Sequence, residues 1–260
     1  MSSQCQGYVK DRNTGVVRQC GWRIQGYCHH HRDQCRGNRV NSKVHCLKKA
    51  KPGCNFCCAA HDPSIPYASP DVFGVKDLRR DKRDGILEQW DKIDPYHNKP
   101  LPLREPSAMQ LDHITEKQLF SLASTRIQLQ DHGLLNLKEE LEKATETIRE
   151  EIANEDKNLC FTLTTTNKIK GAACTNFIND TLMGRPVLTF TDYMMAGHEG
   201  DLVLEPVKLK RSNTKRIRKT MGEATKFCQY KMSDQGESPI FERFAKEFQQ
   251  LFVDMELIVE

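Results

Sequence analysis

The apolar residues in the middle of the chain follow the pattern of two short strands and then that of a helix. Gln110–Ile114 and Leu159–Thr164 read as short strands, the second almost entirely apolar or β-branched. The segment from Asn167 to Asn179 has helical character, and Thr165 or Thr166 is suited to cap its start. The order of strand, returning strand and helix predicts a small α+β unit.

Two amphipathic segments lie between the strands, and a third lies near the end of the sequence. Thr115–Gln130 and Asn136–Ile152 keep apolar stripes at helical spacing, and the second has a strongly acidic outer face. We expect a helical hairpin inserted at 115–156, either packed on its own domain or contacting a partner. Ser238–Leu257 repeats aromatic and aliphatic residues at the same spacing. It predicts a helix that packs into the core or, as the alternative, forms a homodimer interface.

Prolines mark the borders of the expected parts. Seven prolines fall within 62–107, where each removes a backbone donor and favours extended neighbours, so a surface connector is expected there. A Cys/His-rich module at 1–61 precedes it, and an α+β domain at 108–195 follows. The remainder, 196–260, is expected to hold a basic segment and the C-terminal helix, with Leu202–Leu204 as a candidate strand.

Hydropathy excludes two broad classes of protein. No stretch approaches the roughly 20 apolar residues that span a bilayer. The first residues show no basic segment leading into an apolar run, the pattern of a secretory signal. We therefore expect an intracellular protein, nuclear or cytoplasmic, without a membrane partner.

The charge is placed unevenly, although the net charge is only +4. Residues 1–61 carry eleven Lys or Arg against two Asp, and residues 208–219 carry seven Lys or Arg and no acid. Such asymmetry predicts contact with a polyanion, here nucleic acid and preferably DNA, although a basic run can also be solvated surface. The candidate contacts in the second run are Lys208, Lys210, Arg211, Lys215, Arg216 and Arg218.

Cysteine usage indicates metal binding at the beginning of the chain. Eight of the eleven cysteines lie in the first 61 residues, interleaved with five histidines. Without a secretory signal, this mixture favours metal over disulfides or free thiols. The segment repeats Cys-x-Gly, a second cysteine, and then an aromatic residue followed by cysteine and histidine. Three thiolates and one imidazole per repeat suit a closed tetrahedral site, so two structural zinc ions are predicted.

The predicted zinc ligands are Cys5, Cys20, Cys28 and His31 in the first module and Cys35, Cys46, Cys58 and His61 in the second. The third thiolate of the second module is open among three residues. Cys58 keeps the two-residue gap before histidine, Cys57 follows an aromatic residue as Cys28 does, and Cys54 repeats the gap from the second cysteine. We choose Cys58. The modules resemble short C-x-G…C…[YF]-C-x2-H units of eukaryotic and viral proteins, a resemblance that implies binding and not chemistry.

Polar residues at the borders of the two strands and the helix form a candidate catalytic set. Asp112 and Asn167 could hold one divalent cation, His113 could activate water, and Asn158 could fix the imidazole. Phosphodiester hydrolysis needs such a base and a charge-neutralising cation. Each fragment alone is a common structural detail, but their order and spacing make the set informative.

These residues resemble the HNH, or ββα-metal, endonucleases, whose signature runs D-H-I, then N-L, then C/T-x-x-N-x-x-K-G. The chain has Leu111-Asp112-His113-Ile114, then Asn158-Leu159, then Thr164-Thr165-Thr166-Asn167-Lys168-Ile169-Lys170-Gly171. The nine-residue step between the two asparagines agrees with the HNN variants of the family.

The resemblance implies a ββα-metal core in which His113 is the general base and Asn158 orients it. It also implies that Asp112 and Asn167 bind magnesium or manganese, the hard cations that oxygen ligands favour, and that Lys170 contacts a phosphate. The implied activity is metal-dependent hydrolysis of DNA phosphodiester bonds, leaving 5′-phosphate and 3′-hydroxyl ends, with the zinc modules assisting binding. The alternative is a non-catalytic, zinc-containing protein that binds nucleic acid or protein through a degenerate HNH scaffold.

Overall fold

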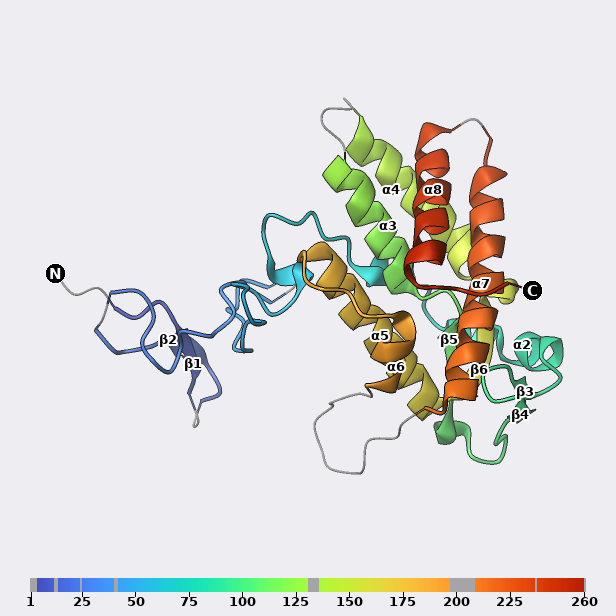
Figure 1. Ribbon diagram of the computed structural model, residues 1–260, viewed down its shortest axis with the longest axis horizontal. Helices are drawn as coiled ribbons and strands as arrows, with labels where there is room; N and C mark the ends of the chain where they lie inside the picture. The colour runs from blue at the N-terminus through green and yellow to red at the C-terminus, as the bar shows by residue number, and fades with distance from the viewer. Residues whose placement is uncertain are drawn as a thin grey trace. The chain divides into compact units, whose positions relative to one another are not determined.

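The computed structural model describes residues 4–11, 14–23, 25–39, 42–130, 136–196, 209–236 and 238–259. The chain forms two compact units (Figure 1). The N-terminal unit comprises Met1–Tyr67 with Leu182–Arg185, and the C-terminal unit comprises Ala68–Thr181 with Pro186–Glu260. Among the described helices, none has the length and apolar character required to cross a membrane. The expected strand at Leu202–Leu204 lies outside the described residues.

Cysteine side chains, and not a core of aliphatic residues, form the interior of the N-terminal unit. In its described residues, the strands β1 (Tyr8–Lys10) and β2 (Val17–Gln19) pair antiparallel, and η1 (Ala59–His61) is a short 3-10 helix. The buried side chains are mainly two groups of cysteines. A segment this poor in buried aliphatic residues is expected to need metal ions for a stable fold.

The two repeats of the N-terminal unit are joined to each other. The Gln34 side chain both accepts from the backbone nitrogen of Tyr8, at 2.8 Å, and donates to its oxygen, at 2.9 Å. The Tyr8 ring also stacks on His45, with ring centroids 4.3 Å apart. These contacts fix one repeat against the other within the unit.

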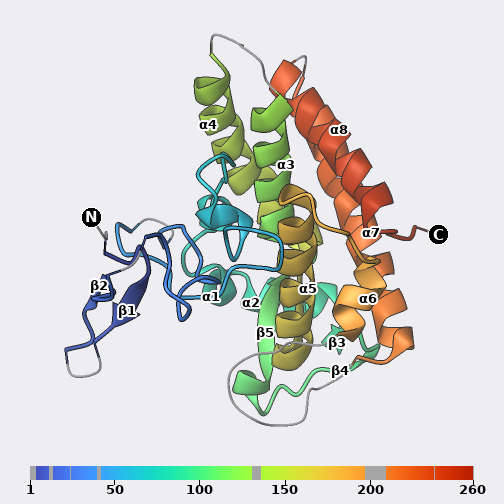
Figure 2. The same ribbon diagram turned by 60° about the vertical axis from the view of Figure 1, so that its left-hand side comes forward.

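The C-terminal unit contains the predicted strand, returning strand and helix. β5 (Met109–His113) pairs antiparallel with β6 (Leu159–Leu163), and the chain passes from β6 directly into α5 (Thr164–Leu182). Figure 2 shows β5 beside α5. The α+β class is confirmed.

Most of the proline-rich segment, from Ala68 onwards, is part of the C-terminal unit, which corrects the expectation of a surface connector at 62–107. It forms η2 (Pro70–Phe73), α1 (Leu78–Asp81), α2 (Arg83–Gln89), β3 (Ile93–Asp94), β4 (Lys99–Pro100) and η3 (Pro106–Ala108). Ile86, Leu87 and Leu101 are buried against the β5–β6 pair. The indole of Trp90 also donates to the backbone oxygen of Leu159 at 2.8 Å. The unit therefore begins at Ala68 and not near Ala108, because these apolar side chains complete its core.

Helices build the rest of the C-terminal unit. They are α3 (Lys117–Gln130), α4 (Leu137–Ile148), the π-turn η4 (Arg149–Ala153), η5 (Asp156–Asn158), α6 (Phe190–Met195), α7 (Arg211–Ser233) and α8 (Pro239–Asp254). α7 and α8 lie side by side (Figure 1). The apolar stripe of α8 faces inward, with Phe248 4.8 Å from Phe120 of α3 between ring centroids. The stripe thus packs into the core, the first of the two expectations, and the homodimer stays a prediction.

Candidate functional site

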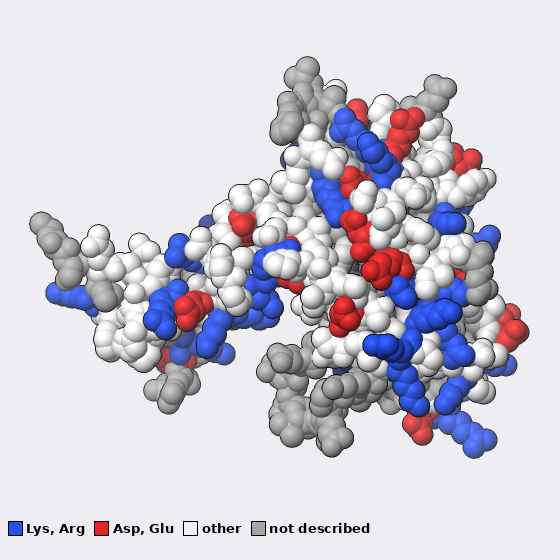
Figure 3. Space-filling model, in the orientation of Figure 1, with Lys and Arg blue, Asp and Glu red and all other residues white. Residues whose placement is uncertain are grey.

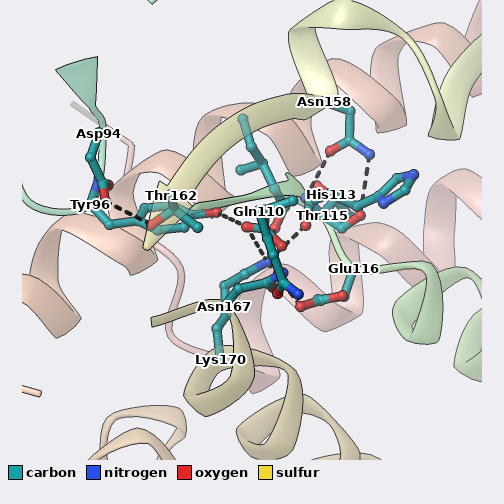
Figure 4. Close-up of polar contacts among 12 residues, drawn as sticks. Asp94, Tyr96, Gln110, His113, Thr115, Glu116, Asn158, Thr162, Asn167 and Lys170 are labelled. Carbon is teal, nitrogen blue, oxygen red and sulfur yellow. Dashed lines mark hydrogen bonds and ion pairs between the residues drawn. The ribbon is translucent and has the colours of Figure 1, made fainter. Parts of the chain in front are cut away.

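One face of α5 lies against one face of β5. Gln110 and Asp112 are two residues apart on the strand, and Asn167 and Lys170 are one turn apart on the helix, so each pair shares a face. The Asn167 amide donates to Gln110 Oε1 at 3.1 Å, and Lys170 Nζ lies 3.0 Å from Asp112 Oδ2. Figure 4 shows Asn167 and Lys170 reaching from the helix towards the strand. The structure thus brings both expected metal ligands, Asp112 and Asn167, to one interface.

The ammonium of Lys170 fills the space between these elements. Its side chain is completely buried, and Nζ lies 3.1 Å from Glu116 Oε1 in addition to Asp112. It also donates to the backbone oxygens of His113, at 2.7 Å, and Ile114, at 3.1 Å. Two carboxylate and two carbonyl oxygens thus lie around the three N–H donors and offset the cost of burying the charge.

The Asp112 side chain is buried, as is that of its partner Lys170. Its side chain is 1% exposed, and the Tyr96 hydroxyl donates to Oδ2 at 2.6 Å, the same oxygen that faces Lys170. Burial raises the pKa of Asp112 to about 7, although the Lys170 ammonium acts against that change. For Lys170, burial alone would lower the pKa, but Asp112 and Glu116 outweigh it, and the pKa is raised. Lys170 is therefore charged throughout the physiological range.

This arrangement does not fit the divalent cation that the HNH resemblance implies. A cation needs free oxygen lone pairs, but the buried Asp112 offers Oδ2, which is already shared by Lys170 and Tyr96. A second positive charge beside the buried ammonium would also be repelled. Magnesium or manganese binding is implied by the resemblance alone.

The imidazole of His113 lies on the other face of β5. It points away from Asn167 and Lys170 (Figure 4), and its Nε2 is 2.8 Å from Asn154 Oδ1. The Asn154 amide nitrogen already donates to the backbone oxygens of Phe73, at 3.0 Å, and Arg149, at 2.7 Å. These two bonds identify the Asn154 atom facing the ring as the oxygen. Nε2 must then carry the proton, and Nδ1 has a free lone pair in the neutral ring.

Electrostatics favour the neutral form of His113. Burial lowers its pKa, and the nearby Lys117 acts in the same direction, whereas the bond to Asn154 opposes them. In the described part of the chain, Nδ1 makes no hydrogen bond. A half-buried, neutral imidazole with a fixed tautomer can accept a proton through Nδ1, which is the requirement for a general base.

Asn158 holds the backbone beyond His113 and not its imidazole, which corrects the expected role. The side chain is fully buried. It accepts from Thr115 N at 2.7 Å and donates to Thr115 O at 3.2 Å and to Ala153 O at 2.8 Å. Its own backbone oxygen receives the N–H of Ile114 at 2.8 Å. Asn158 therefore orients His113 indirectly, by fixing the turn that follows β5.

Sequence reasoning missed three residues of this region. Asn154 fixes the imidazole but lies just past a π-turn inside the expected insertion, and Tyr96 comes from the segment interpreted as a connector. Glu116 is four residues after Asp112, but only the burial of Lys170 shows why two carboxylates are needed there. None of them carries a sequence signal that separates it from ordinary polar residues.

The residues that are expected to contact nucleic acid differ in their exposure and in their ion pairs. Lys210, Arg211, Lys215 and Arg216 are exposed around the start of α7, and Figure 3 shows Lys and Arg side chains gathered over that part of the helix. Arg218 is engaged by Glu256, with 3.2 Å between Nη1 and Oε2. The expected phosphate contact of Lys170 is wrong for this arrangement, because its ammonium is buried. Lys208 lies outside the described residues.

In the N-terminal unit, the first predicted metal cluster is assembled as expected. The ligand atoms of Cys5, Cys20, Cys28 and His31 lie within 4.8 Å of one another. Cys28 Sγ is 3.1 Å from His31 Nδ1, and the backbone nitrogens of Gly7 and Cys28 donate to Cys5 Sγ at 3.4 and 3.2 Å. Burial lowers the pKa of His31, which keeps the imidazole in the neutral form that binds metal.

The second cluster contains Cys57 and not Cys58, which corrects the ligand chosen from the sequence. The ligand atoms of Cys35, Cys46, Cys57 and His61 also lie within 4.8 Å of one another. Cys57 Sγ is 3.1 Å from His61 Nδ1, and the Cys57 nitrogen donates to Cys35 Sγ as that of Cys28 does to Cys5. The match to an aromatic residue before the cysteine was the better guide. Both Cys3His clusters are compatible with structural zinc.

The glycine of each Cys-x-Gly repeat has a steric role. A Cβ at Gly7 would overlap the side chain of His31, and a Cβ at Gly37 would overlap the backbone and Cβ of His61. The histidine ligand of each cluster therefore packs directly on the glycine backbone. The repeat accordingly requires glycine at this position for space and not for a left-handed conformation.

Comparison with known proteins gives no relative, since no family model, no curated protein and no solved structure matches the chain. A functional interpretation rests on the geometry described above and on the two resemblances in the sequence.

The neighbouring Cys57 and Cys58 provide a matched pair for testing the second cluster. We expect Cys57→Ser to lower the zinc content from two ions per chain to one, because it removes a cluster thiol. Cys58→Ser should retain both ions. Native mass spectrometry of the purified full chain measures the stoichiometry, and zinc loss in the Cys58 variant alone would contradict the assignment.

The buried ammonium should dominate the stability of the C-terminal unit. Lys170→Met leaves two carboxylates and two carbonyls without their donor, and we expect a loss of about 3–5 kcal/mol in the free energy of unfolding. The exposed neighbour on α5, changed as Lys168→Met, should stay within about 0.5 kcal/mol of wild type.

Urea unfolding of both variants, of Asp112→Asn alone, and of Lys170→Met combined with Asp112→Asn measures these differences. The double variant should lose less than the sum of the single changes, because it removes both members of one pair. Equal stability of the Lys170 and Lys168 variants would show that the ammonium is not held as described.

Proposed function

We propose that the chain is a nucleic-acid phosphodiester hydrolase in which His113 is the general base. The observation that carries this proposal is the state of its imidazole, which Asn154 holds as the neutral Nε2–H tautomer at the end of β5. The order of β5, β6 and α5 agrees with the ββα arrangement that the resemblance implies. A fixed tautomer with a free Nδ1 and a lowered pKa are properties that a base acting at neutral pH needs, together with reach to the attacking water.

In the proposed step, water attacks the phosphorus atom while its proton passes to Nδ1 of His113. The bond from phosphorus to the leaving oxygen breaks, that oxygen takes up a proton from solvent water, and the imidazolium of His113 then returns its proton to the solvent. Asn154 keeps the ring oriented, and Asn158 keeps the turn after β5 in place. Asp112 and Lys170 hold β5 on α5, so they act on the position of His113 and do not touch the substrate.

The proposal extends to the N-terminal unit as the part that binds nucleic acid. Residues 1–61 carry eleven basic and two acidic residues. Such a surface attracts polyanions in a salt-dependent manner. Exposed cations at the start of α7 would add contacts on the C-terminal unit.

A second candidate function is binding without cleavage, and one observation favours it. The carboxylate expected to hold a metal ion is closed off by Lys170 and Tyr96, as a structural ion pair would be. In that case the ββα arrangement is a scaffold, and the chain binds nucleic acid through its basic surfaces. The two candidates differ in whether His113 is needed for a chemical step.

Plasmid cleavage separates the two candidates. Wild-type protein should nick or linearise supercoiled plasmid, and His113→Ala should lower the rate by about 10²- to 10⁴-fold, the usual contribution of a positioned base. His30→Ala removes an exposed histidine of the N-terminal unit and serves as the matched control.

The reactions are run with magnesium, with manganese and without added cation. A strong chelator is avoided, because it would also remove structural zinc. An intact plasmid under all three conditions, or equal cleavage by the His113 and wild-type proteins, would leave only the binding function.

The pH profile tests the role of Asn154. Because burial lowers the pKa of His113, the acid limb of kcat/KM should lie below the ordinary histidine value of 6.5. Asn154→Asp places a carboxylate beside Nε2, which favours the imidazolium and should move this limb to higher pH. Asn154→Ala removes the orientation without adding a charge, and should lower kcat/KM without that upward shift. An unchanged acid limb in the Asp variant would contradict the assigned contact.

A further inference from the structure

The N-terminal unit contains an open groove beside Cys35 of the second metal cluster, and no cluster ligand is among the residues that line it. Its two walls are residues 32–34 with 36, and residues 49–55, and its volume is about 450 Å³. We call it the basic groove. The polar side chains that line it are Arg32, Asp33, Gln34, Arg36, Lys49, Lys51 and Asn55.

Backbone hydrogen bonds hold the walls of the basic groove together. The nitrogen of Ala50 donates to the oxygen of Asp33 at 2.7 Å, and the nitrogen of Arg36 donates to the oxygen of Asn55 at 2.9 Å. Gln34 is bonded in turn to Tyr8 of the first repeat. The groove is therefore formed before any ligand arrives, which lowers the entropic cost of binding.

The charge of the groove is strongly positive. Four exposed cations, Arg32, Arg36, Lys49 and Lys51, line it with a single carboxylate, Asp33. Asp33 Oδ2 is 3.7 Å from Arg32 Nε, and both side chains are mostly exposed, so this pair neutralises little. In the described part of the chain neither lysine takes part in an ion pair. The Arg36 guanidinium lies 5.3 Å above the centre of the Tyr27 ring, which orients it.

We propose that the basic groove binds the phosphodiester backbone of nucleic acid. Lysine and arginine recognise phosphate through charge and directed hydrogen bonds, whereas the same cations repel metal ions. The volume exceeds that of one phosphate group, and the groove opens onto a unit that carries few acidic residues (Figure 3). A polyanion that continues beyond the groove thus meets further positive charge. This inference deepens the proposed function by assigning where the substrate is held.

The test compares two double variants that remove the same charge. Lys49→Gln with Lys51→Gln changes the groove, and Lys10→Gln with Lys43→Gln changes two exposed lysines elsewhere in the unit. Binding of the zinc-loaded full chain to a labelled DNA duplex is followed by fluorescence anisotropy at several salt concentrations, without magnesium or manganese. Zinc stoichiometry confirms that each variant is assembled.

We expect the groove variant to bind about tenfold more weakly and to lose about 1.8 from the slope of log K against log salt, about 0.9 for each phosphate contact. The control pair should change the slope much less. Equal effects of the two pairs, or no DNA binding by the wild type, would overturn the inference. If the double variant of the groove loses zinc, the DNA binding of the single variants Lys49→Gln and Lys51→Gln is compared with that of the control instead.

Competition separates a polynucleotide from other sources of phosphate. Unlabelled DNA should displace the labelled duplex at micromolar concentration, whereas inorganic phosphate and a mononucleotide should fail to do so at the same concentration. Displacement by the mononucleotide at equal strength would assign the groove to free nucleotides and overturn the polymer assignment. Because no step depends on cleavage, specific binding without plasmid cleavage would reject the hydrolase and leave this inference intact.

Discussion

The buried ammonium of Lys170 is the interaction on which the C-terminal unit depends. It joins three pieces of chain, namely the end of β5, the turn that carries Glu116, and α5. Burying an ammonium ion costs desolvation free energy, and here the four oxygens that converge on it offset that cost. Because Asp112 and the backbone oxygen of His113 both contact this one ammonium, their positions are fixed together. The geometry of His113 follows from that constraint.

The interior of the N-terminal unit is built from a different kind of residue. Its buried residues are mainly cysteines, which offer little apolar area, so we expect metal coordination to supply the stabilisation that aliphatic packing supplies in the other unit. The glycines beside the histidine ligands and the bonds between the repeats arrange these thiols. Because cysteines occupy the interior, most basic side chains of this unit lie on its surface, where a polyanion can contact them.

The sequence predicted well what depends on local pattern. The strands around Asp112 and Leu159, the helix after them and most metal ligands follow from periodicity and spacing. Partners brought by distant segments could not be predicted, because no local signal marks Tyr96 or Asn154. The same limit explains why the proline-rich segment was taken for a connector, since its burial depends on a strand pair formed elsewhere.

Two further differences come from competing patterns within one segment. In the second metal cluster, the gap before histidine favoured Cys58, while the residue type before the cysteine favoured Cys57, and the structure agrees with the latter. α7 was described only as a basic run, because its charged beginning hides Ile217, Met221, Cys228 and Met232, which are buried at helical spacing along it. In both cases the deciding signal was present but was outweighed by a simpler one.

In the sequence, α3 and α4 lie between the two strands that pair, and this order also determines how the chain must fold. Because β5 and β6 are neighbours in the sheet but far apart in sequence, their pairing is a non-local event that closes a long loop. Helices α3 and α4 can form early from local contacts and shorten that loop before the strands meet. Lys170 finds its oxygens only after the strands have paired, so the region around His113 should be among the last to become ordered during folding.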